Sequence, residues 1–376
     1  MPELAEVGDF CPHDSCSDAG KTGEGNIVKY GTTAKGLQRY RCKTCGKTFS
    51  ENTGTIFYNK HTPAEEIIET LALVAEGSRV ASLSRVKGYK EKTIRNWLQQ
   101  AAEHAAQIEN VLMSEYEIER GQLDALWSYV GCKEQESEEG KKDPPDDQPP
   151  DDQKGAYWRS TMIDIDSRLR VGRDIAKTET EASEEVFRTL QQSRGHPDKP
   201  PPTISDGWGG IREAMVQVWG KVPEYKGRGR PPEKKRSQDG WKYLQVIKER
   251  DEKDRVAGRK KKAIFGEEET LLELFEEHTA YVERTHLTMR QMNSRLVRKG
   301  LGFSKELPMH RAAASWEDAI YNLTRTHKSL RIDLTGPLNG QPGRRWEKRT
   351  PAMAAGLTDQ VWSTESLLRT VPTTNT

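Results

Sequence analysis

The sequence predicts an α+β multidomain protein with a small cysteine-rich part, a group of short helices and a larger mixed-sheet α/β domain. Three observations predict this order. Four of the five cysteines lie within the first 60 residues. Apolar residues then recur at helical spacing over residues 61–106. From residue 120 to 310, runs rich in β-branched and aromatic residues alternate with helical runs.

The composition is that of a very polar chain. Charged residues make up 31%, the mean hydropathy is −0.87, and no apolar run approaches the roughly 20 residues that span a bilayer. The acidic start lacks the pattern of a signal peptide, so we expect a cytoplasmic protein without membrane contact. The formal net charge of +1 hides an acidic stretch at 132–152 and basic stretches at 226–262 and 284–311, and basic patches attract phosphate backbones.

The cysteines of residues 1–60 are spaced as metal ligands. Cys11 and Cys16 form one pair, and Cys42 and Cys45 form a second pair that Gly46 follows. Two such pairs supply four thiolates for a tetrahedral, structural Zn²⁺, since four protein ligands leave no position open for chemistry. The first pair is wide, which leaves His13 as an alternative ligand. This predicts a zinc ribbon or knuckle, with Cys132 as a small core residue elsewhere.

Residues 61–106 predict three short helices. A capping box over Thr62–Glu65 begins the first, Gly77 and Gly88 end the first two, and the third begins near Lys90. This pattern is typical of a helix-turn-helix, whose last helix enters the major groove of DNA. An ordinary three-helix packing unit is the alternative.

The third part predicts a meander of three strands at 122–130, 157–165 and 169–176, followed by a helix at 179–192 and a short strand that ends at Asp206. A helix at 211–218, two strands at 241–248 and 256–265, an acidic helical stretch at 267–277 and a basic helix at 281–298 follow. A last helix, at 312–325, precedes a tail. Two polar loops interrupt the domain, an acidic one at 134–153 and a basic one at 226–237.

Three acids of this domain fit the RNase H-like plan: Asp124 on the first strand, Asp206 at a later strand end and Glu283 on a following helix. Three carboxylates on adjacent elements can hold two Mg²⁺ ions (or Mn²⁺) about 4 Å apart for phosphodiester chemistry. Without further support the triad is a weak signal, since most of the 58 acidic residues solvate the surface. Asp164 and Asp166 are rival acids, which we interpret as turn residues.

The same segments resemble IS1-type insertion-sequence transposases. The resemblance is carried by Gly36–Phe49 around the second cysteine pair, Leu123–Gly131, Ser205–Trp208 and Tyr281–Gln291, and it spans roughly residues 11–305. It implies an RNase H-like DDE catalytic domain with Asp124, Asp206 and Glu283 as the metal-binding triad. It also implies that Cys11, Cys16, Cys42 and Cys45 bind zinc.

Basic and polar residues outside the triad are candidate DNA contacts. His286 and Arg290 share the helical face of Glu283, and the basic loop around Arg228 and Arg230 resembles a minor-groove AT-hook. For each group a solvated surface is the alternative. Tryptophans 208, 219 and 241 are expected in the core. The full set expected to contact DNA is Lys90, Lys92, Thr93, Asn96, Arg228, Arg230, His286, Arg290, Arg298, Lys299 and Lys305.

Four domains result: a zinc knuckle (1–60), a helix-turn-helix (61–106), a catalytic domain (120–310) and a C-terminal helix and tail (311–376). The expected function is a DNA transposase that binds the terminal inverted repeats and the target as double-stranded DNA, cleaves, and transfers strands. Because two ends must be held together, we expect a homodimer or higher oligomer. A transposase-derived DNA-binding regulator without catalysis and an RNase H-like nuclease remain the alternatives.

Overall fold

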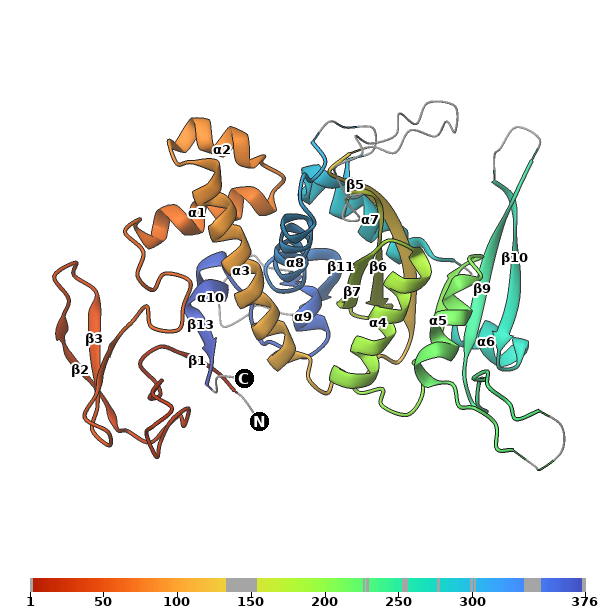
Figure 1. The fold of residues 1–376 in the computed structure, drawn as a ribbon, viewed down its shortest axis with the longest axis horizontal. Helices are drawn as coiled ribbons and strands as arrows, with labels where there is room; N and C mark the ends of the chain where they lie inside the picture. Colours follow the sequence, from red (N-terminus) through yellow and green to blue (C-terminus); the bar gives the residue numbers. More distant parts are fainter. Residues whose placement is uncertain are drawn as a thin grey trace. The chain divides into compact units, whose positions relative to one another are not determined.

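The computed structural model covers the 376-residue chain and describes residues 3–132, 154–225, 227, 230–251, 256–275, 278–297, 300, 302–334 and 346–373 (Figure 1). The chain forms two compact units. One consists of Met1–Leu112 together with Ala312–Thr376, and the other is Met113–Arg311. The acidic loop expected at 134–153 lies outside the described residues.

The cysteine-rich part of the first unit contains a three-stranded antiparallel sheet. Its strands are β2 (Ile27–Thr32), β3 (Gln38–Cys42) and β4 (Thr48–Ser50). Tyr40 of β3 stacks on Phe49 of β4, with ring centroids 5.6 Å apart. Such a small sheet buries little apolar surface, so the cysteine cluster at its end has to supply much of its stability.

Three helices follow, α1 (Ala64–Ala75), α2 (Val80–Lys87) and α3 (Glu91–Leu112). The α1 cap differs from the prediction, because Pro63 occupies the N-cap position and no side chain caps the helix. The capping box expected at Thr62–Glu65 is therefore absent. At the end of α2, Gly88 adopts the left-handed conformation expected of a C-cap glycine.

The C-terminal residues pack against these helices. In α8 (Leu307–Leu323), Trp316 Nε1 donates to the carbonyl of Leu71 at 3.0 Å, and Asn322 donates to buried Glu109 at 2.9 Å. The segment expected to be a tail is folded. It contains β11 (His327–Asp333), β12 (Trp346–Arg349), α9 (Pro351–Ala354), α10 (Thr364–Arg369) and β13 (Thr370–Pro372), which pairs with β1 (Leu4–Glu6).

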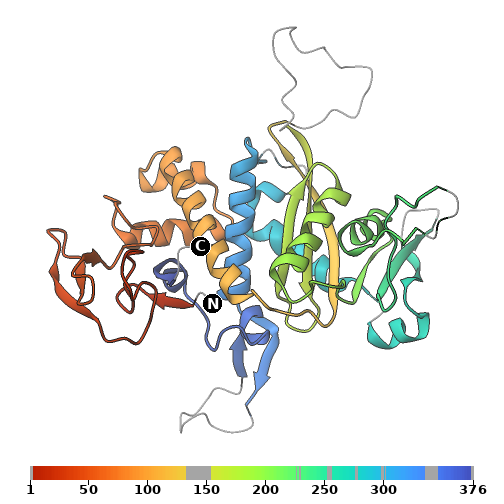
Figure 2. The ribbon, with the colours of Figure 1, turned by 60° about the horizontal axis from the view of Figure 1, so that its bottom comes forward.

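The second unit is built on a six-stranded mixed sheet with the order β10-β9-β8-β5-β6-β7 (Figures 1 and 2). Its strands are β5 (Gly121–Val130), β6 (Gly155–Asp164), β7 (Arg170–Ala176), β8 (Thr203–Asp206), β9 (Tyr243–Arg250) and β10 (Val256–Phe265). The first three form an antiparallel meander, β8 and β9 continue parallel to β5, and β10 is antiparallel to β9. The expectation of a mixed α/β domain is confirmed.

Helices cover both faces of this sheet. On one face, α4 (Glu179–Ser193) contacts the meander through a Ser160–Ser183 hydrogen bond, and α5 (Gly210–Trp219) packs beside α4. On the opposite face, α6 (Glu268–Leu274) packs on Leu244, and α7 (Ala280–Met292) packs on Leu126 through Met289. Side chains alternate between the faces along each strand, so Asp124 lies on the same face as Leu126, the face of α7.

Two local predictions have different outcomes. The basic helix expected at 281–298 ends at Met292, because Asn293 is extended and its side chain accepts from the N–H of Arg295 in a following 3₁₀ turn. The Asp164–Asp166 turn is confirmed, since Asp164 Oδ1 accepts from the N–H of Asp166 and its other oxygen accepts from Ser167.

Candidate acidic site

Asp124 and Asp206 lie side by side in the sheet. Strands β5 and β8 are parallel, and Leu123 is opposite Ser205, so the next residues along, Asp124 and Asp206, are neighbours across the two strands. Neighbouring strands are about 4.8 Å apart, and paired residues direct their side chains to one face. Two carboxylates distant in the sequence therefore lie next to each other on one face of the sheet, on its two central strands.

Glu283 reaches the same face because Gln122 attaches α7 to β5. Gln122 Oε1 accepts from the N–H of Val282 at 3.0 Å, and its Nε2 donates to the carbonyl of His278 at 3.0 Å. The start of α7 is thus fixed beside the residue two positions before Asp124. Glu283 follows Val282 directly, and His286 lies one helical turn further on, with Nδ1 3.4 Å from Asp124 Oδ2.

Each of the three acids has a nearby polar partner. Glu283 Oε1 accepts from Lys248 Nζ at 2.6 Å and from Thr279 Oγ1 at 2.9 Å. Asp206 Oδ1 accepts from the N–H of Trp208 at 3.1 Å, and Asp124 Oδ1 from the N–H of Ala125 at 2.8 Å. The Lys248 ammonium supplies positive charge to Glu283.

The electrostatics show that the acids act on one another. Burial, followed by the negative charges of Asp206 and Glu283, raises the pKa of Asp124 to about 7. For Glu283, burial acts to raise the pKa, but the hydrogen bonds from Lys248 and Thr279 outweigh it, so its pKa is lowered. The cluster therefore concentrates negative charge that Lys248 and Arg259 neutralise only in part.

A fourth acid, Glu179, interacts electrostatically with Asp206 and Asp124. It is buried at the first position of α4, and burial, then Asp206 and Asp124, raise its pKa to about 8. Sequence reasoning missed it, because an acid in the first turn of a helix is ordinarily explained by the helix dipole. Thr178 and Glu181 do form a capping box there, which was also not predicted.

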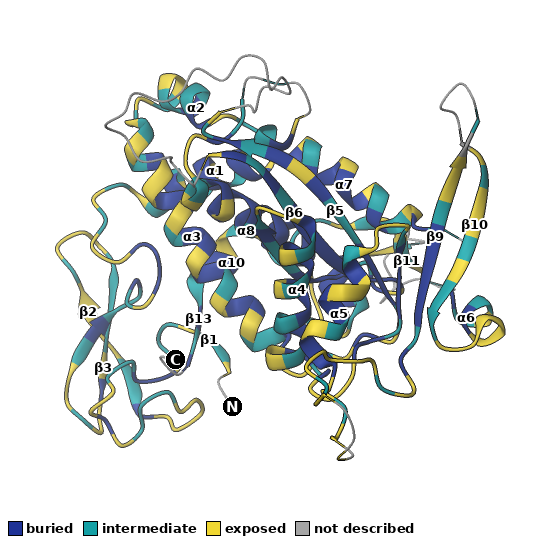
Figure 3. Ribbon diagram, turned by 45° about the vertical axis from the view of Figure 1, so that its right-hand side comes forward, coloured by how far each residue is buried: buried dark blue, intermediate teal, exposed yellow. Residues whose placement is uncertain are grey.

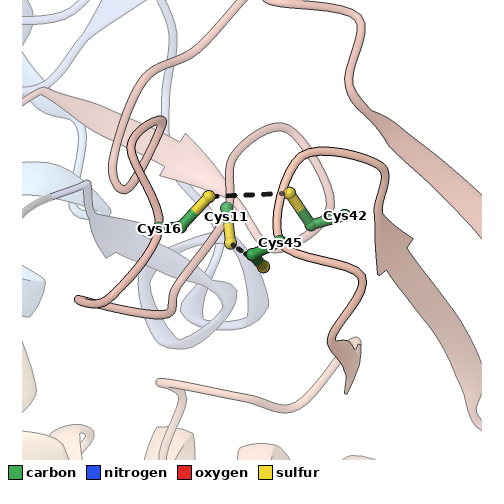
Figure 4. A group of neighbouring side chains, drawn as sticks. All are labelled: Cys11, Cys16, Cys42 and Cys45. Atoms are coloured by element: carbon green, nitrogen blue, oxygen red, sulfur yellow. Dashed lines mark hydrogen bonds between the residues drawn. The ribbon is translucent and has the colours of Figure 1, made fainter.

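The four cysteines meet in one cluster, as predicted (Figure 4). Their sulfur atoms all lie within 4.8 Å of one another, with 3.7 Å between Cys11 and Cys45 and 3.8 Å between Cys16 and Cys42. Thiolates around a tetrahedral zinc with bonds of about 2.3 Å are about 3.8 Å apart, so the cluster suits a structural zinc ion. His13 is not a member of the cluster and contacts the ring of Phe49 instead.

The turn at the second cysteine pair prepares Cys42 for a metal. Gly46 has a φ of 73° and donates its N–H to the carbonyl of Cys42, which closes the turn. Burial acts to raise the pKa of Cys42, but hydrogen bonds from the backbone of Cys45 and Thr44 outweigh it and lower the pKa to about 7. A thiol with this pKa is readily available as the thiolate that zinc requires.

Within the described residues, the cysteine cluster is the only group of three or more potential ligands close enough to hold one ion. The three acids lie at one face of the sheet and interact electrostatically, but their oxygen atoms are not close enough together to hold one ion as the sulfur atoms are. Glu283 is instead directed to Lys248. The two sites therefore differ. The cysteine sulfur atoms already lie at the spacing that a zinc ion requires, whereas the carboxylates do not yet surround a single position.

The expected DNA contacts are distributed over both units. At the start of α3, Lys90, Lys92 and Asn96 are exposed, while Thr93 is half-buried. His286 is buried against Asp124, and Arg290 is half-buried further along α7. Arg230 pairs with Glu233, and Lys305 Nζ lies over the ring of Phe303. Arg228, Arg298 and Lys299 lie outside the described residues.

Two expectations about core residues are wrong. Cys132 is exposed, because it follows Val130 just beyond the end of β5. Trp208 is 47% exposed, whereas Trp219 and Trp241 are buried as expected. The backbone explains Trp208: it lies two residues after the strand end at Asp206, where the chain leaves the sheet.

Comparisons with known proteins add little to this geometry. No protein-family profile matches the chain, and no curated protein does. Among solved structures, the chain is similar to the Mos1 transposase paired-end complex with left transposon end, at 9% identity over 70% of this chain and 80% of that one. The TM-score of 0.17 is too low to carry an argument about fold or function. No helix in the described ranges is long and apolar enough to cross a membrane.

Proposed function

We propose that this protein is a DNA transposase of the DDE type, which cleaves and joins DNA at Asp124, Asp206 and Glu283. The observation that carries the proposal is the register of β5 and β8, which makes Asp124 and Asp206 neighbours on the face that α7 covers with Glu283. The strand order supports it, since an antiparallel meander extended by two parallel strands on the side of its first strand is the RNase H-like plan. The resemblance of the motifs to IS1-type transposases is the further support.

The residues fit a hard divalent cation. Carboxylate oxygens are the donors that Mg²⁺ prefers, and burial together with the charges of Asp206 and Glu283 raises the pKa of Asp124, which a bound cation would lower. Asp124, Asp206 and Glu283 would hold the metal, which when bound supplies charge stabilisation at a phosphodiester and activates its attacking oxygen. His286 orients the Asp124 carboxylate from α7, and Lys248 holds Glu283 in a fixed rotamer.

DNA binding belongs to the same proposal. The exposed Lys90, Lys92 and Asn96 at the start of α3 fit the recognition position of a helix-turn-helix, and a zinc-bound four-cysteine knuckle would steady the adjoining part of that unit. Homodimers or larger assemblies would hold two element ends together.

The test is a strand-transfer assay with Mg²⁺ and labelled duplexes taken from the DNA that flanks the coding sequence on each side. Joined product supports a transposase, cleavage without joining supports a nuclease, and binding alone supports a regulator. Asp124→Asn is expected to abolish cleavage and to leave duplex binding unchanged. Equal loss of cleavage and binding would mean that Asp124 has only a structural role.

A further inference from the structure

The β9–β10 hairpin extends beyond the acidic site as a two-stranded arm. Strand β8 ends at Asp206, which is opposite Val246. β9 continues to Arg250, paired from there on only with β10, so four residues project past the acids, a length of about 13 Å. Figure 3 shows this arm, with exposed residues along β10. A two-stranded ribbon of this kind fits the major groove of DNA.

The arm is basic, and its charges divide between two faces. Lys261 pairs with Val246, which pairs with Asp206, so Lys261 shares the face of the acids at about 10 Å, two strand spacings away. Arg259 and Lys248 lie opposite each other on that same face. Lys260 and Lys262 alternate with them and point to the other face.

The pair of Arg259 and Lys248 works against the hairpin, because like charges directly opposite on neighbouring strands destabilise it. Glu283 offsets the charge of Lys248 at 2.6 Å. Arg259 is exposed and its charge acts on Glu283 from a distance, but in the described part of the chain no carboxylate forms a salt bridge with it. Lysines that only protect a sheet edge from other strands would serve on either face and need no such pair.

We infer that the face of the arm with Lys248, Arg259 and Lys261 binds the phosphate backbone of a DNA duplex next to the acidic site. This rests on the proposed function. The distance of about 10 Å from Asp206 to Lys261 corresponds to about three base-pair steps, so the arm holds phosphates close to the one that is cleaved. The contact is to the backbone and independent of sequence, and it positions the scissile phosphate over the acids.

Because neighbouring side chains of β10 point to opposite faces, two adjacent residues provide a test variant and its matched control. Arg259→Gln and Lys260→Gln each remove one positive charge from adjacent residues that face opposite ways. Binding of the full-length protein to a labelled 30-base-pair duplex is measured by fluorescence anisotropy from roughly 50 to 200 mM salt, with Ca²⁺ in place of Mg²⁺ to prevent cleavage. Arg259→Gln is expected to weaken binding several-fold and to reduce the salt slope by about 1, while Lys260→Gln matches the wild type. Arg259→Lys should restore most of the affinity.

Equal losses in both variants, or a loss in neither, would overturn the inference. If wild-type protein cleaves DNA in Mg²⁺ and Arg259→Gln binds the duplex normally, the inference that the arm binds phosphates is refuted, while the proposed function stands. If wild-type protein binds no duplex at all, the proposed function fails and the arm fails with it. Circular dichroism of each variant at the assay temperature identifies a loss caused by unfolding.

Discussion

Replacing Asp124 with asparagine should stabilise the metal-free protein at high pH. The pKa of Asp124 is about 7 in the folded chain and near 3.8 in an unfolded one. Between these values the folded state binds more protons than the unfolded state, so stability falls as pH rises. The loss is complete above pH 7 and absent below pH 4. Asp124→Asn has no such proton to lose.

The size of the stability change follows from the pKa shift of Asp124. About three pKa units at 1.36 kcal/mol each give an upper value of about 4 kcal/mol at pH 8, and because Asp124 is buried, solvent screens little of it. For a unit of this size that corresponds to a rise in Tm on the order of 10 °C. The measurement is thermal unfolding in EDTA at pH 5 and pH 8. The variant should exceed the wild type at pH 8 by several degrees more than at pH 5.

Exposed Asp198→Asn is the matched control, because it makes the same chemical change away from the site. Mg²⁺ should reduce the difference by more than half, since a cation at the acids stabilises the wild type by about 2.7 kcal/mol at one hundred times its Kd and has little to bind in the variant. If Asp124→Asn shows the same pH profile of thermal unfolding as the wild type, the pKa of Asp124 is not raised. The argument for a metal site at these acids then fails.

Three further predictions concern other residues. Cys42→Ser should reduce zinc content in metal analysis and lower DNA affinity, while Mg²⁺-dependent stabilisation persists; normal zinc content would contradict the four-cysteine site. Glu179→Gln should stabilise the metal-free protein by an amount that grows as pH rises from 4.5 to about 8, between the unfolded and the folded pKa of this carboxyl, and should weaken Mg²⁺ binding in calorimetry; no change in either would place Glu179 outside the site. His310 bridges Ser128 and Ser304, and burial lowers its pKa to about 3, so stability should fall as pH drops from about 6.5 towards 3. His310→Gln should flatten that acid limb in thermal unfolding, and an unchanged limb would mean that other groups cause it.

The strands and helices of the second unit were largely predictable from local pattern. The predicted strand at 256–265 matches β10, and the helix predicted at 179–192 differs from α4 by one residue, since alternation and helical spacing are local signals. The pairing of β1 with β13 was not predictable, because two three-residue strands separated by almost the whole chain have no periodicity to detect. Propensity also does not reveal that Asn293 ends α7.

Of the candidate site, the sequence indicated the three acids and the neighbouring His286. Motif resemblance selected Asp124, Asp206 and Glu283, and whether these three bind metal stays a prediction. Glu179 and Lys248 carry no sequence signal that separates them from the other charged residues. Each becomes visible only through the sheet register and the attachment of α7 by Gln122, which are properties of the folded chain.

The cost of the acidic site to folding is itself an argument for function. Burial beside Asp206 opposes ionisation of Asp124 and Glu179, and apolar or amide side chains at these two positions would remove that cost. Lys248 and Arg259, opposite each other on the same face of the sheet, add a second unfavourable arrangement. The positive groups offset the negative ones only in part, since Lys248 and Arg259 lower the pKa of Glu283 whereas the pKa of Asp124 stays raised. Under the proposed function, a divalent cation at the acids and a phosphate backbone at the arm would offset the charge that remains on each side.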